Sequence, residues 1–125
     1  MHLLLVDDEP SLLHLLGQHL VRQGHTVESA ASVAGARVLI PASSLNAAVF
    51  DAAVFDAAVI DWTLPDGTGL DIGCALLEGH PNIHVVFTSG YPLDIAVVPA
   101  DLRARVHVLQ KPFLPRALAE ILKSL

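Results

Sequence analysis

The chain lacks several features on which whole classes of protein depend. Cysteine occurs once in 125 residues, at Cys74, which excludes a disulfide framework and a zinc site built from cysteines. Seven Lys and Arg stand against thirteen Asp and Glu, and this net charge of −6 argues against direct nucleic-acid binding. The longest stretch without a charged residue, 79–93, contains two prolines and is shorter than the ~20 residues of a membrane span. No basic segment precedes an apolar run at the N-terminus, so we see no signal peptide and expect a cytoplasmic protein.

The length and the apolar content predict a single domain with its own hydrophobic core. The chain is close to the commonest domain size, and hydrophobic residues make up 53% of it, with a mean hydropathy of +0.56. Short apolar runs alternate with amphipathic stretches, which is typical of a parallel sheet whose strands are connected by helices. We therefore predict an α/β domain over residues 1–125, with an open doubly wound sheet, helices on both faces, and strands at residues 3–6, 26–30, 57–61, 83–88 and 106–109.

Proline, glycine and serine mark the expected ends of three helices. Pro10 suits the first turn of a helix whose leucines recur at helical spacing, and Gly24 is placed to end it. Ser32 can cap a second helix that runs to Ile40. Pro115 opens the last helix, whose apolar stripe consists of Leu114, Leu118, Ile121, Leu122 and Leu125.

The two helices between these give weaker signals. Thr68 and Asp71 resemble a capping box at the start of a third helix. The face that we expect this helix to bury consists of Leu70, Cys74 and Leu77. Pro99 interrupts the pattern between residues 92 and 105, so a fourth helix is expected to be short or irregular.

A tandem repeat of five residues precedes the third predicted strand. Residues 47–51 and 52–56 both read AAVFD, and residues 57–61 read AAVID. Only the last copy runs into the loop signature LPDG, so we interpret it as the strand. We expect the region around residues 42–56 to be an insertion outside the common sheet, as extra helix or loop.

Polar side chains follow the predicted strands where an open parallel sheet binds its ligands, outside the carboxyl ends. The residues at these positions are Asp7, Asp8, Asp61, Thr88, Ser89 and Lys111. Converging carboxylates need a compensating cation, and Mg²⁺ prefers such oxygen ligands and often shares its site with phosphate. A lysine and a hydroxyl can contact phosphoryl oxygens, and an aspartate can act as a nucleophile towards phosphorus.

Four segments in this order resemble the response regulator receiver domain, the phosphoacceptor module of two-component signalling. They are LLLVDDEP at residues 3–10, AAVIDWTLPDGTGLD at 57–71, VVFTSGYP at 85–92 and LQKPF at 109–113. The resemblance implies a flavodoxin-like five-stranded sheet of order 2-1-3-4-5, covering essentially the whole chain. It also implies a cis peptide bond between Lys111 and Pro112.

The resemblance implies a role for each of the polar residues. Asp61 would be the phosphoacceptor, with Lys111 as the phosphate-contacting lysine and Thr88 as the switch hydroxyl. Asp7 and Asp8 would hold Mg²⁺ together with Asp61 and the carbonyl of Thr63, and Asp8 would be a direct ligand. Asp51 and Asp56 copy the local context of Asp61, but no LPDG loop follows either of them.

Three features depart from the family pattern. Val108 stands where the family usually places Tyr or Phe, three residues before the lysine. Pro99 lies in the fourth helix, and the distance from Asp8 to Asp61 is about ten residues longer than usual, an excess that two AAVFD copies account for. The seven histidines are scattered along the chain, and we interpret all of them as structural or surface residues.

The sequence thus predicts a receiver that takes a phosphoryl group from a histidine kinase or phosphotransfer protein and switches a surface for an unidentified downstream protein. Enzymatic activity would extend at most to Mg²⁺-dependent self-phosphorylation and slow autodephosphorylation. One alternative is a pseudo-receiver that only binds a partner and is never phosphorylated. Another, a haloacid-dehalogenase-like enzyme, is set aside because Thr63 stands where that family needs a second aspartate. Both a stand-alone receiver and a piece of a larger protein fit the sequence.

Overall fold

The computed structural model describes residues 1–40 and 55–125. The five long strands are β1 (His2–Val6), β2 (Thr26–Ala30), β3 (Ala57–Asp61), β6 (His84–Ser89) and β7 (Val106–Gln110), and a short antiparallel pair consists of β4 (Thr63–Leu64) and β5 (Gly67–Thr68). The helices are α1 (Pro10–Arg22), α2 (Val33–Leu39), α3 (Gly69–Gly79) and α4 (Pro115–Lys123), with single 3₁₀ turns η2 (Ile95–Val97) and η3 (Arg103–Arg105). Of the expected insertion, residues 42–54 lie outside the described part of the chain.

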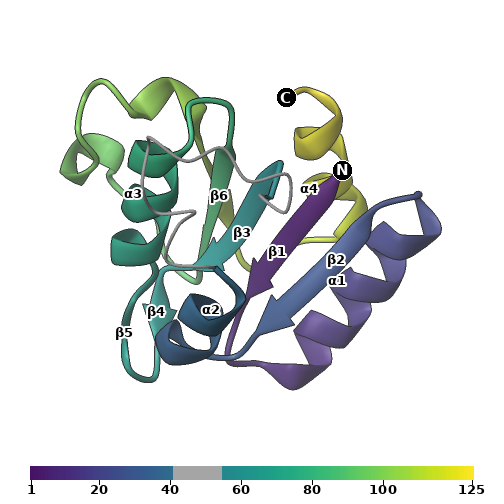
Figure 1. The fold of residues 1–125 in the computed structure, drawn as a ribbon. Helices are drawn as coiled ribbons and strands as arrows, with labels where there is room; N and C mark the ends of the chain where they lie inside the picture. The colour runs from purple at the N-terminus through teal and green to yellow at the C-terminus, as the bar shows by residue number, and fades with distance from the viewer. Residues whose placement is uncertain (41–54) are drawn as a thin grey trace.

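The main sheet has the topology that the sequence predicts. Its five strands are all parallel, in the order β2-β1-β3-β6-β7, which is 2-1-3-4-5 when the long strands are numbered along the chain (Figure 1). Each predicted strand agrees with the observed one to within one residue at either end. None of the helices in the described ranges is long and apolar enough to cross a membrane.

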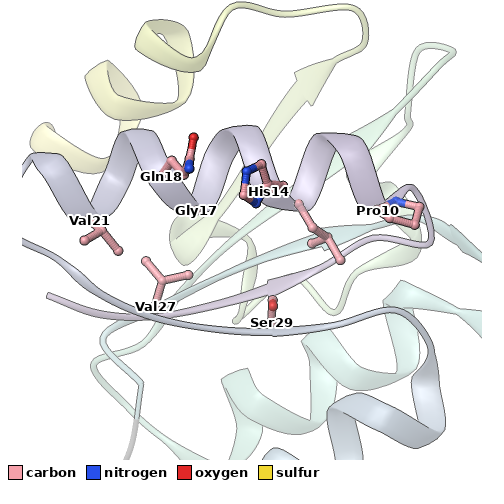
Figure 2. Close-up of a pocket in the computed structure, with 8 residues that line it drawn as sticks. Pro10, His14, Gly17, Gln18, Val21, Val27 and Ser29 are labelled. Carbon is pink, nitrogen blue, oxygen red and sulfur yellow. The ribbon is translucent and has the colours of Figure 1, made fainter.

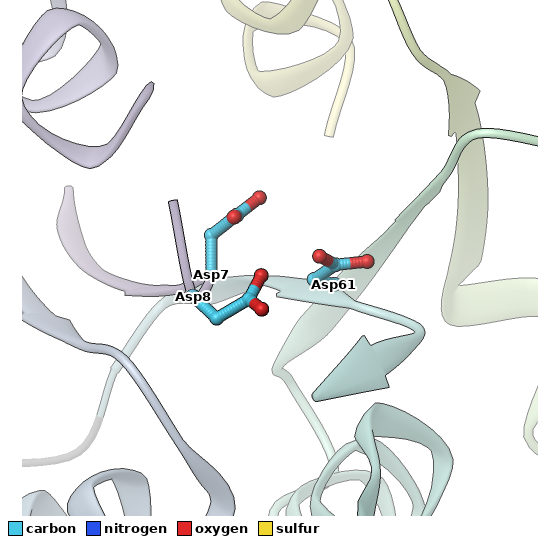
Figure 3. A group of neighbouring side chains, drawn as sticks. All are labelled: Asp7, Asp8 and Asp61. Atoms are coloured by element: carbon cyan, nitrogen blue, oxygen red, sulfur yellow. The ribbon is translucent and has the colours of Figure 1, made fainter. Parts of the chain in front are cut away.

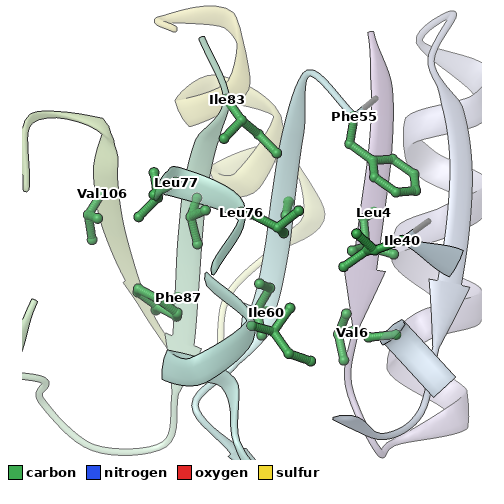
Figure 4. Packing of buried hydrophobic residues seen from close by; sticks show 14 of the residues in the cluster. Leu4, Val6, Ile40, Phe55, Ile60, Leu76, Leu77, Ile83, Phe87 and Val106 are labelled. Carbon is green, nitrogen blue, oxygen red and sulfur yellow. The ribbon is translucent and has the colours of Figure 1, made fainter. Parts of the chain in front are cut away.

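Two apolar layers sandwich the sheet, with α2 and α3 on one face and α1 and α4 on the other (Figure 1). The first layer packs Ile72 and Leu76 of α3 and Ala36 of α2 against the strands, and Phe55 joins it just before β3 (Figure 4). The second layer contains Leu3, Leu5, Leu16, Leu20, Ala57, Val59, Val86, Leu118 and Leu122. The central strand β3 is buried along its whole length, which explains its uninterrupted apolar sequence.

Alternation along the strands gives the face that carries α1 and α4 a regular composition. Side chains two residues apart on a strand point to the same face. The polar residues two positions before or after the apolar residues of the second layer therefore lie on the same face as that layer. On this face the polar positions at the carboxyl ends are Asp7, Asp61, Thr88 and Lys111, and those at the amino ends of β6 and β7 are His84 and His107.

The helix signals are confirmed in part. Gly24 follows α1 with a φ of +93°, and the Ser32 side chain accepts a hydrogen bond from the Gly35 N–H at 3.0 Å. The capping box is wrong, because Thr68 precedes α3 without a capping hydrogen bond from its side chain. The predicted α3 face is right only in part. Leu77 is buried and Leu70 packs against the core, but Leu70 and Cys74 are only partly buried, and the other buried positions are Gly69, Ile72, Gly73, Leu76 and Gly79.

The stripe of the last helix is predicted correctly except at its start. Leu118 and Leu122 are buried, and Ile121 and Leu125 pack beside them. Leu114 is 59% exposed, because it precedes the first turn of α4 instead of lying on the inward face.

Between β6 and β7 the chain forms an irregular segment, as Pro99 predicts. Two arginines of this segment bind backbone carbonyls, Arg103 within the segment and Arg105 before β6. The Arg103 guanidinium donates to the carbonyls of Ala96 and Val98, both at 2.9 Å. Arg105 donates to the carbonyls of Leu77 and His80 at the end of α3 and of Ile83 just before β6, at 2.6–3.0 Å. Arg103 thus satisfies carbonyls of the irregular segment itself, and Arg105 satisfies carbonyls at and beyond the end of α3, which have no partner within that helix.

Candidate functional site

The polar residues that the sequence places at strand ends meet at the carboxyl edge of the sheet. Asp7 follows β1, Asp61 ends β3, and Lys111 follows β7. Thr88 of β6 is the direct register partner of Asp61 and is buried. Four segments that are distant in the sequence therefore contribute to one cluster.

Three carboxylates of this cluster face one another (Figure 3). Asp7, Asp8 and Asp61 each offer one oxygen, and these oxygens all lie within 4.8 Å of one another. Asp7 and Asp61 are buried, whereas Asp8 is exposed and leaves the cluster open to water. This is the only such group of three His, Cys, Asp or Glu side chains in residues 1–40 and 55–125.

Lys111 binds both buried carboxylates. Its Nζ lies 2.8 Å from Asp7 Oδ2 and 3.1 Å from Asp61 Oδ2. Burial alone would lower the pKa of Lys111, but the hydrogen bonds and charges of the two aspartates outweigh burial and raise it. Lys111 therefore stays charged at neutral pH and compensates part of the negative charge.

The Asp61 carboxyl is held in an environment that disfavours its charge. Burial raises its pKa above the ordinary aspartate value, and the neighbouring Asp7 charge acts in the same direction. Lys111 and the Thr63 N–H, which donates to Asp61 Oδ1 at 3.3 Å, lower the pKa without cancelling the effect of burial. A cation bound beside Asp61 would offset the remaining free-energy cost of burying its negative charge.

The loop after β3 packs against Asp61 without room for a side chain. The Gly69 N–H donates to the Trp62 carbonyl at 2.9 Å, and a Cβ on Gly69 would collide with the Asp61 carbonyl oxygen. Only glycine permits this approach, so the second glycine of LPDGTG is a packing requirement. The Trp62 and Phe87 rings pack edge-on, with their centroids 5.1 Å apart.

Two further observations concern Lys111 and Thr63. The Lys111–Pro112 peptide bond is cis, as the resemblance implies. The Thr63 hydroxyl lies 3.5 Å from the Tyr91 hydroxyl in the loop after β6, so this loop touches the one that follows Asp61.

Several contacts were missed by the sequence reasoning. Asp66 of the LPDG loop accepts hydrogen bonds from the N–H groups of Val33 and Ala34 at 2.8 and 2.9 Å, and so caps α2 from a distance. The aspartate in LPDG could have indicated a capping residue, but the sequence does not show which helix it caps. His84 Nδ1 lies 3.2 Å from His107 Nε2, although the two are 23 residues apart in the sequence.

The other candidate positions lie elsewhere. Asp56 precedes β3 and accepts a hydrogen bond from the His2 N–H at 2.7 Å, so it sits at the strand end opposite to Asp61. Asp51 lies outside the described residues. A groove between α1 and β2 contains none of the candidate residues, and its lining is Pro10, Leu13, His14, Gly17, Gln18, Val21, Val27 and Ser29 (Figure 2).

Comparison with known proteins identifies the family. The family model described as "Response regulator receiver domain" matches residues 3–123. The chain is 33% identical over 110 residues to the photosynthetic apparatus regulatory protein RegA of Cereibacter sphaeroides and, equally, to that of Rhodovulum sulfidophilum. Each match covers 88% of this chain and 54% or 55% of the relative, so the chain spans about half the length of these relatives.

Solved structures agree in fold. A CheY-like receiver domain from Methanospirillum hungatei has a TM-score of 0.78 at 27% identity, over 98% of this chain and 90% of that one. A response regulator receiver protein from Sinorhizobium medicae has a TM-score of 0.80 at 25% identity, over 99% and 92%. The chain therefore belongs to the response regulator receiver domain family of two-component signalling.

Proposed function

We propose that this receiver accepts a phosphoryl group on Asp61 from a phosphohistidine of a histidine kinase or phosphotransfer protein. The observation that carries the proposal is the position of the Asp61 carboxylate, 3.1 Å from Lys111 Nζ and beside two further carboxylates at one sheet edge. We also place the chain in the cytoplasm.

The proposed step is a displacement at phosphorus. An oxygen of the Asp61 carboxylate attacks the phosphorus atom, and the bond from phosphorus to the donor nitrogen breaks, with its electron pair leaving on the imidazole. We expect Lys111, which lies 3.1 Å from Asp61 Oδ2, and the hydroxyl of Thr88, the register partner of Asp61, to hydrogen-bond the phosphoryl oxygens as their charge redistributes. Hydrolysis of the resulting acyl phosphate returns Asp61 and inorganic phosphate, which is the slow autodephosphorylation that we expect.

The donor set at this edge fits Mg²⁺. All three side chains offer carboxylate oxygens, the ligands that Mg²⁺ prefers, and the exposed Asp8 leaves positions for water. We assign Asp7, Asp8, Asp61 and the Thr63 carbonyl as the groups that hold the ion. When bound, Mg²⁺ would neutralise the carboxylates and the phosphoryl oxygens that they face.

The proposed output is a change in the surface next to Thr88. Contact between Thr88 and a phosphoryl oxygen would draw the loop after β6 inwards, and the irregular segment that follows would move with it. Val108 is 37% exposed and lacks the aromatic ring usual in the family, so this switch would work without an aromatic rotamer. The surface of the η2–η3 segment, β7 and α4 is where we expect a downstream protein to bind.

The test is phosphorylation by a small donor. The chain is incubated with acetyl phosphate and Mg²⁺, and the adduct is mapped by mass spectrometry. We expect one phosphoryl group on Asp61, lost in Asp61→Asn and strongly reduced in Lys111→Ala. The variant Asp56→Asn is the matched control, because the same AAV-X-D context surrounds it at the other end of β3.

Two outcomes would contradict the proposal. Modification at Asp51 or Asp56 in place of Asp61 would overturn the assignment of the acceptor. A chain that binds Mg²⁺ but takes no phosphoryl group from acetyl phosphate or from a phosphohistidine protein would be a pseudo-receiver.

We also propose that the repeat copies are an insertion into a single receiver domain. Because the copies are identical, deleting either one leaves a phenylalanine and an aspartate before β3, the positions of the buried Phe55 and of Asp56. We expect a chain lacking residues 47–51 to fold and to bind Mg²⁺. Loss of folding in this deletion, measured by circular dichroism, would mean that the repeat belongs to the fold.

A further inference from the structure

The two histidines His84 and His107 form a second cluster on the face of the sheet that carries Asp61, at the opposite end. They stand on the adjacent parallel strands β6 and β7, where Val86 pairs with His107 and His84 lies two residues earlier on the same side. Their rings have centroids 5.4 Å apart and planes inclined by 32°. The nearest nitrogens, His84 Nδ1 and His107 Nε2, are separated by 3.2 Å.

This separation suits a shared metal ion as well as a hydrogen bond. Zinc–nitrogen bonds are about 2.0–2.1 Å long, and two such bonds to nitrogens 3.2 Å apart enclose roughly 100°, close to a tetrahedral angle. To bind one ion, each ring must turn so that its lone pair points at the metal and no longer at the other ring. Because both side chains are partly exposed, water can reach the remaining coordination positions.

The protonation state of the pair favours a metal. Burial lowers the pKa of both rings below the ordinary histidine value, and the Arg105 charge lowers that of His84 further, as His84 does for His107. Both imidazoles are therefore neutral at pH 7, which is the form that binds metal ions. The Arg105 guanidinium itself is held on three backbone carbonyls, those of Leu77, His80 and Ile83.

We propose that His84 and His107 bind one Zn²⁺ ion per chain, with water completing the coordination, at a site separate from the acidic cluster. Imidazole suits Zn²⁺, whereas Mg²⁺ prefers oxygen, so the two sites differ in the ion that they select. The ion would link the edge strand β7 to β6 and stabilise the folded chain, because the unfolded chain does not hold the two rings together.

The primary test reads the rings directly in the unmodified chain. Zn²⁺ is titrated into the ¹⁵N-labelled protein, and the imidazole nitrogens are followed by NMR. We expect His84 Nδ1 and His107 Nε2 to shift together and to saturate at one ion per chain, with no such shift on adding Mg²⁺. Unchanged ring nitrogens at saturating Zn²⁺ would overturn the proposal, and saturation at half an ion per chain would replace it with a site shared between two copies.

Variants supply the second test. We expect His84→Gln and His107→Gln each to weaken Zn²⁺ binding by at least ~10-fold and to abolish the rise of the thermal midpoint with Zn²⁺. His2→Gln and His14→Gln are matched controls, since His2 lies 2.8 Å from Glu28 on other strands and His14 is exposed on α1. Zn²⁺ affinity that is unchanged in both test variants, or lost in a control, would place the ion elsewhere.

Asp61→Asn separates this site from the acidic cluster. The substitution removes a carboxylate from the proposed Mg²⁺ site and leaves both histidines in place. We expect Zn²⁺ binding at the histidine pair to be unchanged in it, and a parallel loss there would assign the ion to the carboxylates.

Discussion

The two ends of the sheet face that carries α1 and α4 differ in charge and in access to solvent. At the carboxyl end, Asp7, Asp61 and Lys111 form a partly compensated charged cluster, and two of these residues are buried. At the amino end, His84 and His107 form a neutral pair that is partly exposed. The apolar layer between them separates the two clusters, and along β7 the four residue steps from His107 to Lys111 span roughly 13 Å. The same face of the sheet thus presents carboxylates after β1 and on β3 at one end and imidazoles on β6 and β7 at the other.

The largest expected effect comes from filling the contact beneath Asp61. Gly69→Ala places a Cβ against the Asp61 carbonyl and the Ile60 side chain. We therefore expect the free energy of unfolding to decrease by at least about 1–3 kcal/mol. The matched control is Gly17→Ala on α1, where a Cβ meets nothing within 4 Å and helix propensity predicts a gain of up to ~1 kcal/mol. Urea unfolding measures the stability of both variants. Equal effects would mean that the carboxyl end of the sheet is no more tightly packed than the groove between α1 and β2 that Gly17 lines.

The second prediction concerns the charge at the carboxyl end. In the absence of divalent metal, Asp61→Asn removes a buried charge next to Asp7, so we expect the thermal midpoint to rise by about 4 °C, or roughly 1 kcal/mol. Mg²⁺ should raise the midpoint of the wild type and leave that of the variant unchanged. His84→Gln is the control for the other end and should keep the full response to Mg²⁺.

The third prediction uses pH to test the link from the LPDG loop to α2. The backbone N–H groups of Ala34 and Val33 lower the pKa of Asp66, so the folded chain favours the carboxylate. Its contribution to stability is therefore present above the ordinary pKa of 3.8 and is lost as the pH falls through the lower folded value. Asp66→Asn should lower the urea midpoint at pH 7, and this difference should shrink in acid. The exposed Glu120→Gln on α4 is the control, and a difference that is constant with pH would contradict the charged cap.

The smallest expected effect is optical. Trp62 is the single tryptophan, directly follows Asp61 and contacts Phe87, so Mg²⁺ at the carboxyl end should change its emission in a saturable way. Beryllofluoride should change it again, and Asp8→Ala should weaken both responses. Zn²⁺ added to the Asp61→Asn variant should leave the emission unchanged if the histidine pair is the separate site that we propose.

The strands and the carboxyl-end cluster could be predicted from the sequence because their signals are local. Continuous apolar runs mark strands buried on both faces, and parallel topology brings the residues after them, such as Asp61 and Lys111, to one edge. The histidine pair could not be predicted in this way, because it depends on the register between β6 and β7. The α3 face was predicted correctly only at Leu77, for a related reason. Its inward side contains Gly69 and Gly73, which no hydrophobic pattern identifies and which lie against Asp61 and Phe87.

The arginines of the segment between β6 and β7 have a consequence for how that region opens. Within it, Arg103 holds the carbonyls of Ala96 and Val98, and isolated backbone bonds such as Val98 to Ile95 and Leu102 to Pro99 form no continuous ladder. Arg105 instead ties the segment to the carbonyls of Leu77, His80 and Ile83 before β6. A helix loses its hydrogen bonds as a cooperative unit, whereas bonds held by separate side chains break one at a time. Amide protons in residues 95–105 should therefore exchange with solvent at individual, graded rates, while those of α3 exchange together. Replacing Arg105 by lysine would keep the charge but lose the planar fork of donors, and would release the end of α3 into the fast-exchanging group.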